Sequence, residues 1–236
     1  MAIDLTGQRV LVVGGAGGIG RATAEAFATM GASVVAAGRT KSTIEAVARS
    51  VAGEAIELDV RDNQQVEAIF AGRPHFDHVI VAAASTIAGS VTGLALDDAR
   101  AAMESKFWGA YQIARAAKVN DGGSITFVSG VLSQRPSATS VLQGAINAAL
   151  EALARGLALE RAPVRVNTIS PGLIDTPLHD RMSADARHRL YERMAATLPA
   201  RRMGQARDVA QAIIFVAANP FVTGSTVSVD GGGRIA

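Results

Sequence analysis

Short runs of apolar, β-branched residues alternate along the chain with longer, alanine-rich stretches of helical character. The runs expected as strands are Val10–Val13, Ser33–Ala37, Ala55–Leu58, His78–Val81, Ser124–Val128, Val164–Ile169 and Thr226–Val229. Helices are expected near residues 18–30, 41–51, 62–71, 95–118, 137–161 and 207–218. Strands that are apolar throughout are typical of a parallel sheet covered on both faces. The pattern therefore predicts an α/β fold, a doubly wound parallel sheet of about seven strands with helices on both faces.

Residues 175–204 interrupt this alternation. The segment is polar, opens with Thr176-Pro177 and closes with Pro199 and Gly204. Its composition suits a short helical lid over a substrate. No linker, repeat or low-complexity tract divides the chain, so residues 1–236 are expected to form a single domain.

The composition of the chain argues against several classes of function. Hydrophobic residues make up 49% of the 236 positions and charged residues 19%, as in compact folds with buried strands. The net charge is only +2, and no basic run with interleaved aromatic residues points to a nucleic-acid partner. No apolar run approaches the ~18 residues of a membrane span. The start MAIDLTGQ lacks the basic region of a signal peptide, so we expect a cytoplasmic protein with no membrane partner.

The chain contains no cysteine, which excludes disulfides, thiolate chemistry and cysteine-ligated metals. Its four histidines show no metal-binding spacing, so no metal site is expected at His179 or elsewhere. His75 and His78 flank the fourth predicted strand and are expected at the surface.

A glycine-rich turn directly follows the first predicted strand and leads into the first predicted helix. Its key residues are Gly14, Gly17, Gly18, Ile19 and Gly20. Glycines let the backbone turn sharply and approach a pyrophosphate, while the helix N-terminus supplies free N–H groups and a positive dipole end. Glycine turns also join strands to helices for purely structural reasons. The position between strand and helix favours a Rossmann-type dinucleotide site.

The end of the second predicted strand indicates which dinucleotide binds. NAD enzymes place an acidic residue there to accept hydrogen bonds from the ribose hydroxyls. This chain has Arg39 instead, and no acid occurs between Ala32 and Glu45. A guanidinium suits the 2′-phosphate of NADP(H), and Arg21 could add a second positive charge. The alternative is that Arg39 is a solvated loop residue.

These segments, in this order, resemble the short-chain dehydrogenase/reductase family over nearly the full chain. Gly14, Gly18 and Gly20 match its glycine signature, and Asn167 to Gly172 is similar to its N-x-x-x-P-G segment. The resemblance implies that Asp59 binds the adenine amino group, and that Ile174 and Thr176 meet the nicotinamide carboxamide. The cofactor-binding residues expected in all are Gly14, Gly17, Gly18, Ile19, Gly20, Arg21, Arg39, Asp59, Val60, Ala82, Ala83, Ala84, Pro171, Gly172, Ile174 and Thr176.

The catalytic segments differ from the family's pattern, which uses an asparagine, a serine, and a tyrosine and lysine four residues apart. Aligned on the helix that ends at Glu160, the tyrosine position holds Gln143 and the lysine position holds Asn147. The serine position falls at a glycine, with Ser129 beside it, and Lys106 stands in place of the asparagine. The candidate catalytic residues are therefore Lys106, Ser129, Gln143 and Asn147.

Lys106 is the member of this set that can exchange a proton, because an amide such as Gln143 cannot. A lysine beside a nicotinamide could have a lowered pKa and act as acid and base. Alternatively, Lys106 snorkels from a helix that packs against a partner subunit.

Two hypotheses follow for the function. In the first, the protein is an NADP(H)-dependent oxidoreductase of this family that acts on a small carbonyl or alcohol substrate through an unusual proton transfer. In the second, it is a catalytically silent NADP(H)-binding protein, such as a redox sensor or an assembly partner. The family's habit of pairing the helices that carry Lys106 and Gln143 implies a homodimer or homotetramer.

Overall fold

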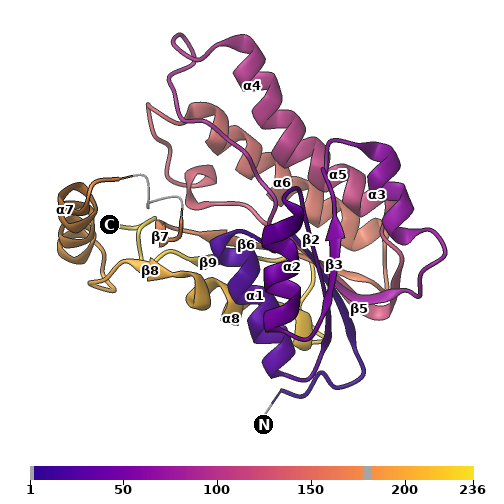
Figure 1. The fold of residues 1–236 in the computed structure, drawn as a ribbon. Helices are drawn as coiled ribbons and strands as arrows, with labels where there is room; N and C mark the ends of the chain where they lie inside the picture. Colours follow the sequence, from indigo (N-terminus) through magenta and orange to yellow (C-terminus); the bar gives the residue numbers. More distant parts are fainter. Residues whose placement is uncertain (1–2, 178–181) are drawn as a thin grey trace.

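Seven parallel strands form the main sheet of the computed structural model, which describes residues 3–177 and 182–236 (Figure 1). The strand order is β3-β2-β1-β4-β5-β6-β9. The strands are β1 (Arg9–Val13), β2 (Ser33–Gly38), β3 (Glu54–Glu57), β4 (Phe76–Val81), β5 (Val119–Val128), β6 (Arg165–Pro171) and β9 (Thr226–Val229). The predicted fold class and strand number are confirmed.

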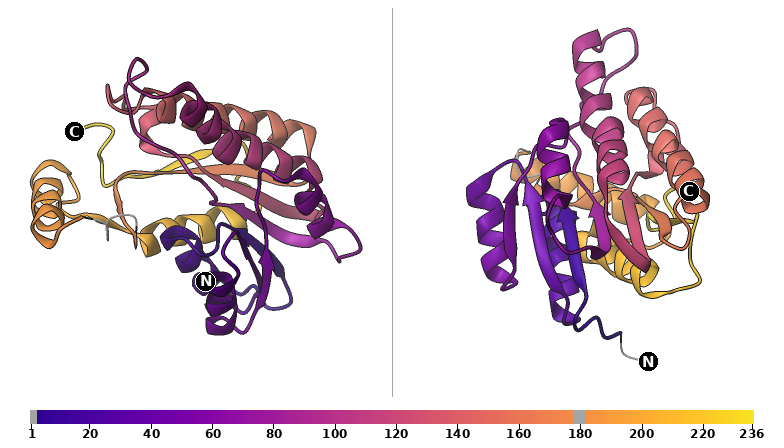
Figure 2. Two further views of the ribbon diagram at one scale, coloured as in Figure 1. Left: turned by 45° about the horizontal axis from the view of Figure 1, so that its top comes forward. Right: turned by 90° about the vertical axis from the view of Figure 1, so that its right-hand side faces the viewer.

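Helices cover both faces of the sheet (Figure 2). They are α1 (Gly18–Thr29), α2 (Lys41–Ser50), α3 (Asn63–Phe70), α4 (Leu96–Met103), α5 (Gly109–Ala116), α6 (Val141–Glu160), α7 (Ala184–Thr197) and α8 (Ala206–Ala218). Phe27 of α1, Ile44 of α2 and Ile213 of α8 belong to the apolar cluster on one face. Ile69 of α3, Ile113 of α5 and Leu150 of α6 belong to the cluster on the other face.

The strand β1 shows why the apolar runs are continuous. Leu11 and Val13 point into one cluster, and Val10 and Val12 point into the other. All four are fully buried, because successive side chains of a strand alternate between faces that are both covered.

The carboxyl ends of β1 and β4 lie next to each other, with Val13 paired to Val81. From β1 the chain moves outward through β2 and β3, and it returns to β4 on the other side of β1. Such a reversal opens a crevice at the carboxyl ends of the two strands, which is where ligands bind in this architecture.

The helix predicted over residues 95–118 is interrupted in its middle. After α4, residues Glu104–Trp108 form a π-helical turn, η1, before α5 begins at Gly109. A 3.6-residue hydrophobic period does not reveal one widened turn, so the sequence pattern missed it. Single π turns are frequent at functional sites, and this one carries Lys106.

The helix predicted over residues 137–161 begins later, at Val141. Ser137 accepts a backbone hydrogen bond from Ser140, and its hydroxyl lies 3.1 Å from that of Thr139. Short hydroxyl side chains that bond to near neighbours favour turns over helix, which explains the later start.

His78 lies in the core, so its predicted surface position is wrong. It is only 4% exposed, whereas His75 lies on the surface as predicted. The reason is that β4 is an interior strand, covered on both faces. The ring centroid of His78 lies 5.8 Å from that of Phe27 in α1.

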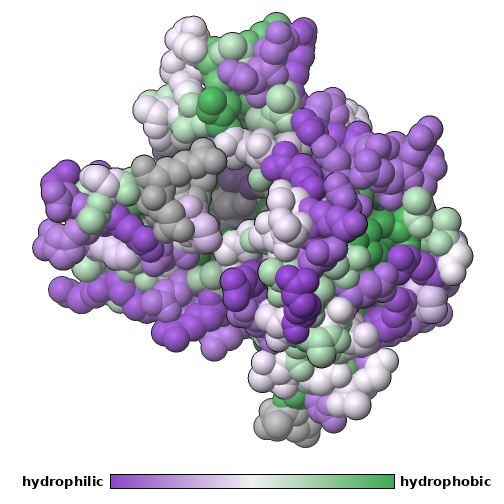
Figure 3. Space-filling model, in the orientation of Figure 1, coloured by the Kyte–Doolittle hydropathy of each residue, from purple (hydrophilic) through white to green (hydrophobic). Residues whose placement is uncertain are grey.

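The segment after β6 contains the helix that its composition suggested. Two short strands, β7 (Ile174–Asp175) and β8 (Gly204–Gln205), pair in parallel and bracket α7. Hydrophilic residues dominate the surface of α7, which stands at the edge of the molecule (Figure 3). Arg187 of α7 donates a hydrogen bond of 2.8 Å to Asp175, and His179 lies outside the described residues.

Among residues 3–177 and 182–236, no helix is both long and apolar enough to cross a membrane.

Candidate functional site

A cavity of about 200 Å³ opens at the carboxyl ends of the central strands. It brings together eight of the residues predicted to bind a cofactor: Gly14, Gly17, Arg39, Asp59, Val60, Ala82, Ala83 and Ala84. The lining also contains residues that sequence reasoning missed: Val13, Ala16, Gly38, Thr40, Leu58 and Ser105. Most of these flank a predicted residue, so proximity in the chain was the signal for them.

The glycine turn is packed tightly against the loop after β4. Gly14 has a φ of +85°, and a Cβ atom there would lie 2.5 Å from the backbone nitrogen of Ala83. A Cβ atom on Gly20 would lie 2.1 Å from the carbonyl oxygen of Gly14. No side chain caps the N-terminus of α1, so its first N–H groups remain for another acceptor. This bare backbone cradle fits the phosphates of a dinucleotide.

The far end of the cavity carries Arg39 and Asp59. Arg61, next to this lining, donates to Asp59 with an Nη2–Oδ2 distance of 2.5 Å. Hydrogen bonds from Arg61 hold the pKa of Asp59 below its usual value, and the positive charge of Arg39 adds to this effect. Asp59 is therefore an ionised acceptor at neutral pH, which suits an amino group of a bound base.

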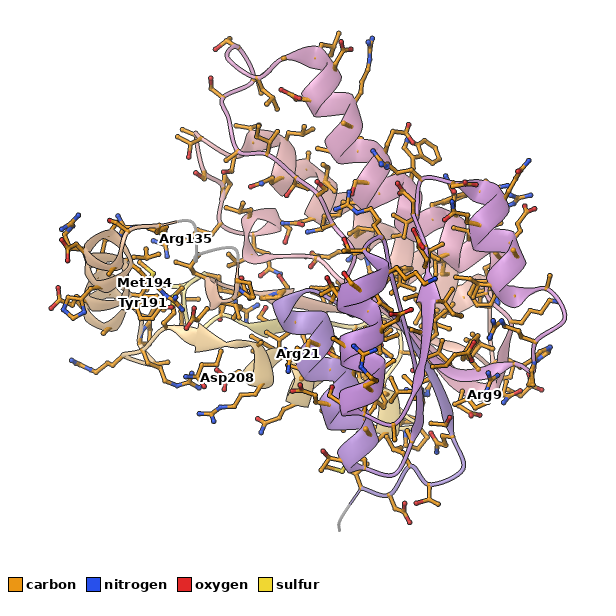
Figure 4. All side chains as sticks on the ribbon, viewed as in Figure 1. Arg9, Arg21, Arg135, Tyr191, Met194 and Asp208 are labelled. Carbon is orange, nitrogen blue, oxygen red and sulfur yellow. The ribbon has the colours of Figure 1, made fainter. Side chains whose placement is uncertain are left out.

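Arg21 does not belong to this lining. Arg21 lies on α1 (Figure 4), and its Nε donates to Glu25 at 2.9 Å, one turn further along the helix. Both side chains are largely exposed. The structure therefore pairs the second predicted cation with a carboxylate on the outer surface of the helix.

The residues after β6 approach the glycine turn from the other side. Pro171 ends β6, and the amide of Gly172 donates to Val229 at 3.0 Å. Ile174 is buried, and Thr176 contacts the turn closely: a Cβ atom on Gly18 would lie 2.9 Å from the Cβ of Thr176. The predicted cofactor-binding residues after β6 thus lie next to the start of α1. Ile19, in the first turn of α1, packs towards the core.

Three of the four candidate catalytic residues meet around Lys106, whose neighbour in sequence, Ser105, lines the cavity. The ammonium of Lys106 on η1 donates to the carbonyl oxygen of Ser129 at 2.8 Å and to Oδ1 of Asn147 on α6 at 2.7 Å. A Cβ atom on Gly130 would lie 2.8 Å from Nδ2 of Asn147, so glycine leaves room for that amide. The neighbouring Ser105 accepts a hydrogen bond from the amide of Ser85, which ties η1 to the loop after β4.

The ammonium of Lys106 points into the protein. Burial lowers its pKa to about 8, and the negative charge of Glu151 opposes this shift. The interpretation of Lys106 as a snorkelling side chain is therefore wrong, because both of its hydrogen-bond acceptors belong to the interior of the same chain.

Glu151 is a member of this cluster that sequence reasoning missed. It is 7% exposed, and its Oε1 accepts hydrogen bonds from the hydroxyls of Ser129 at 2.9 Å and Ser133 at 2.6 Å. Since Ser129 has a single hydroxyl proton, it cannot at the same time donate to a substrate oxygen. The four-residue spacing from Asn147 to Glu151, which puts both on one helix face, was the available signal.

Gln143 lies one turn before Asn147 on α6 but bonds elsewhere. Its Nε2 donates to the hydroxyl of Thr86 at 3.1 Å. The structure therefore does not join Gln143 to Lys106, Ser129 and Asn147 by a hydrogen bond.

Comparison with known proteins places this geometry in a family. The family described as Enoyl-(Acyl carrier protein) reductase matches residues 14–233. The short-chain dehydrogenase/reductase ucsE of Acremonium sp is 30% identical, over 100% of this chain and 98% of the relative. Carbonyl reductase family member 4 of Danio rerio is 30% identical, over 94% of this chain and 96% of its own.

Solved structures agree with these relatives. A small-chain dehydrogenase in complex with NADPH is 35% identical, with a TM-score of 0.85 over 97% of this chain and 99% of the other. Matches of this identity and coverage show that the chain belongs to the short-chain dehydrogenase/reductase family.

Proposed function

We propose that the protein is an NADP(H)-dependent oxidoreductase acting on a small carbonyl or alcohol substrate, with Lys106 as its proton donor and acceptor. The observation that carries the proposal is the ammonium of the half-buried Lys106, which two acceptors hold at 2.8 and 2.7 Å. Its neighbour in sequence, Ser105, lines the cofactor cavity. A buried cation without a structural partner of opposite charge in contact is costly, so a role in chemistry explains it better than one in folding.

The preference for NADP(H) rests on Arg39. It lines the cavity at the end of β2, where an enzyme specific for NAD(H) would place an acid. The related small-chain dehydrogenase in complex with NADPH supports the same cofactor. When bound, the nicotinamide supplies or accepts the hydride, and the protein must supply orientation and a proton.

The catalytic set supports a proton transfer unlike the family's usual one. Where the family resemblance expects asparagine and lysine, this chain carries Lys106 and Asn147, so that an ammonium and an amide are both present with their positions exchanged. Gln143, at the tyrosine position, can donate a hydrogen bond to a carbonyl oxygen but cannot release a proton at neutral pH.

Lys106 meets the requirements of a general acid. With a pKa of about 8 it is mostly protonated at neutral pH, yet close enough to neutrality to release and regain a proton. Ser129 and Asn147 accept two of its three N–H bonds, which leaves the third for a substrate oxygen. Asn147 and the end of β5 thus orient the donor.

A silent NADP(H)-binding protein is the second candidate. It is favoured by the positions of the two tyrosines in the chain, Tyr111 and Tyr191. Tyr111 lies on α5 and is 42% exposed, and Tyr191 lies on α7, so neither lines the cavity. A phenol is then not available as the acid, and an inert site would bind the cofactor without turning it over.

The proposal includes a homodimer or homotetramer. Trp108 and Tyr111 stack edge to face with a centroid distance of 5.6 Å on the outer side of η1 and α5, and each is 42% exposed. Large exposed aromatic side chains on a helix suit an interface between copies of the chain. Light scattering at micromolar concentration should give a mass above the 24.3 kDa of one chain, and a monomer would contradict this part.

The experiment that tests the function uses Lys106→Met, which keeps the apolar stem and removes the ammonium. NADPH oxidation is followed over a panel of small carbonyl compounds, and NADPH affinity is titrated separately. We expect turnover to fall by about 10²–10⁴-fold, the usual contribution of a general acid, with affinity nearly unchanged. Lys118→Met, at an exposed position, is the matched control. Binding without turnover in the parent protein would favour the silent binder.

A further inference from the structure

The buried carboxylate of Glu151 takes no direct part in the proposed proton transfer. It projects from the middle of α6, where a charged side chain is rarely enclosed unless it is paired. Its neighbours are two hydroxyls from the segment after β5, those of Ser129 and Ser133, which both donate to the same oxygen, Oε1. An enclosed charge of this kind costs free energy unless something compensates for it.

The two opposite charges of the cluster are joined through one residue. Lys106 donates to the backbone oxygen of Ser129, while the hydroxyl of Ser129 donates to Glu151. Ser129 therefore fixes the ammonium on one side and the carboxylate on the other, without a direct ion pair between them.

We propose that Glu151 is a positioning residue of this site: it fixes the segment after β5 through Ser129 and Ser133 and supplies the negative charge on the side of Ser129 opposite the Lys106 ammonium.

The groups around Lys106 support this assignment. From the segment after β5 it meets a neutral backbone oxygen, that of Ser129, and from α6 it meets the neutral amide of Asn147. The loop after β4 is tied to the neighbouring Ser105 by Ser85, and residues 82–85 of that loop carry no charge. The negative charge of Glu151 raises the pKa of Lys106, which burial lowers. Without it, the ammonium would lose its proton at a lower pH.

The composition of the chain allows a direct test, because it contains only three lysines, Lys41, Lys106 and Lys118. In protein labelled with ¹³C-lysine, the Cε shifts report each titration, and the exposed Lys41 and Lys118 serve as internal references. We expect the parent midpoint for Lys106 near a pKa of about 8. In Glu151→Gln it should fall by roughly one pH unit, the effect of removing a nearby opposite charge.

Glu160→Gln is the matched control, the same change at an exposed position in the last turn of α6. It should leave the Lys106 titration unchanged. A folded Glu151→Gln protein with the parent midpoint would overturn the proposal.

Should Glu151→Gln fail to fold, the double variant Lys106→Met/Glu151→Gln decides. If the two charges compensate each other, removing both restores the fold that removing one destroys. A double variant no more stable than the single one would contradict the assignment.

The role of Glu151 rests on the proposed function, but the experiments can separate the failure of one from the failure of the other. If Glu151→Gln moves the Lys106 titration while Lys106→Met turns over substrate at the parent rate, Glu151 is the counter-charge of a lysine that is not the acid. If Glu151→Gln leaves the Lys106 titration unchanged and Lys106→Met turns over substrate at the parent rate, both proposals are wrong and the cluster is structural. In an active enzyme, Glu151→Gln should also shift the alkaline fall of kcat to lower pH.

Discussion

Lys106 Nζ lies 2.7 Å from the side-chain oxygen of Asn147, so an ammonium carried by η1 meets an amide carried by α6. The family resemblance implies the opposite arrangement, with the amide on η1 and the ammonium on α6. Because the two groups have exchanged positions and stay in contact, the local charge and the hydrogen bond between them are preserved. The proton-bearing nitrogen is thereby carried by η1 and not by α6, and Gln143 bonds to Thr86 and not to this nitrogen.

The exchange predicts how the two positions depend on each other. Asn147→Lys alone would place a second ammonium against Lys106 in a buried setting, and we expect a loss of about 3 kcal/mol or more in the free energy of unfolding. The reversed pair, Lys106→Asn/Asn147→Lys, should recover most of this loss because one ammonium and one amide face each other again. Urea unfolding of the two variants measures the difference. Equal losses in the single and double variants would show that the positions are independent.

The glycine turn predicts a difference between two glycines of similar backbone conformation. Gly7 and Gly14 have φ values of +82° and +85°, but a Cβ atom meets nothing within 4 Å at Gly7 and lies 2.5 Å from Ala83 N at Gly14. Gly7→Ala should cost about 1–2 kcal/mol of stability, the penalty for a left-handed conformation. Gly14→Ala should cost about 1–3 kcal/mol more and abolish cofactor binding, because the turn must move. Similar losses in thermal unfolding would argue against the close packing.

Arg39 and Arg21 predict unequal contributions to cofactor preference. We expect at least a tenfold preference for NADP(H) over NAD(H), which corresponds to about 1.4 kcal/mol. Arg39→Ala should remove most of it, since Arg39 lines the cavity. Arg21→Ala should change it less, because Glu25 already occupies that guanidinium at 2.9 Å. Calorimetric titration of both cofactors measures the effect, and equal affinities in the parent protein would contradict the assignment.

The sequence predicts those parts of the fold that depend on neighbours in the chain. The strand β1 could be predicted because burial on both faces requires a continuous run of apolar residues. The turn after it could be predicted because a sharp turn requires glycines. Half of the predicted cofactor-binding residues line the cavity for the same reason, because the ends of the parallel strands β1 and β4 lie at one edge of the sheet.

The candidate catalytic cluster depends instead on contacts between residues that lie far apart in the sequence. Glu151 meets Ser129 and Ser133, which lie 22 and 18 residues away in sequence. The π turn that carries Lys106 leaves no trace in the hydrophobic period. Whether a lysine snorkels outward or points inward was therefore open until the packing of α6 against η1 was known.

The position of His78 also depends on residues far apart in the sequence, and it leads to a prediction about stability in acid. Its Nε2 lies 2.8 Å from Gln8 Oε1, 70 residues away, and its Nδ1 lies 2.8 Å from Ser124 Oγ. Since an amide oxygen only accepts, Nε2 donates and Nδ1 receives the hydroxyl proton of Ser124. The ring is thus held neutral.

Burial, reinforced by the positive charge of Arg165, lowers the pKa of His78 from 6.5 to about 4, against a smaller opposing effect of Asp77. Between these values the unfolded chain binds a proton that the folded protein does not. The contribution of His78 to the free energy of unfolding is therefore fully present above pH 6.5. It falls as the pH drops towards 4, by about 3 kcal/mol at 1.36 kcal/mol for each pKa unit.

Urea unfolding at several pH values should show this loss in the parent and in the exposed-site control His75→Gln. His78→Gln should lose less over the same range, because an amide does not titrate. If its stability falls with pH as steeply as that of the parent, carboxylates and not His78 govern the acid response.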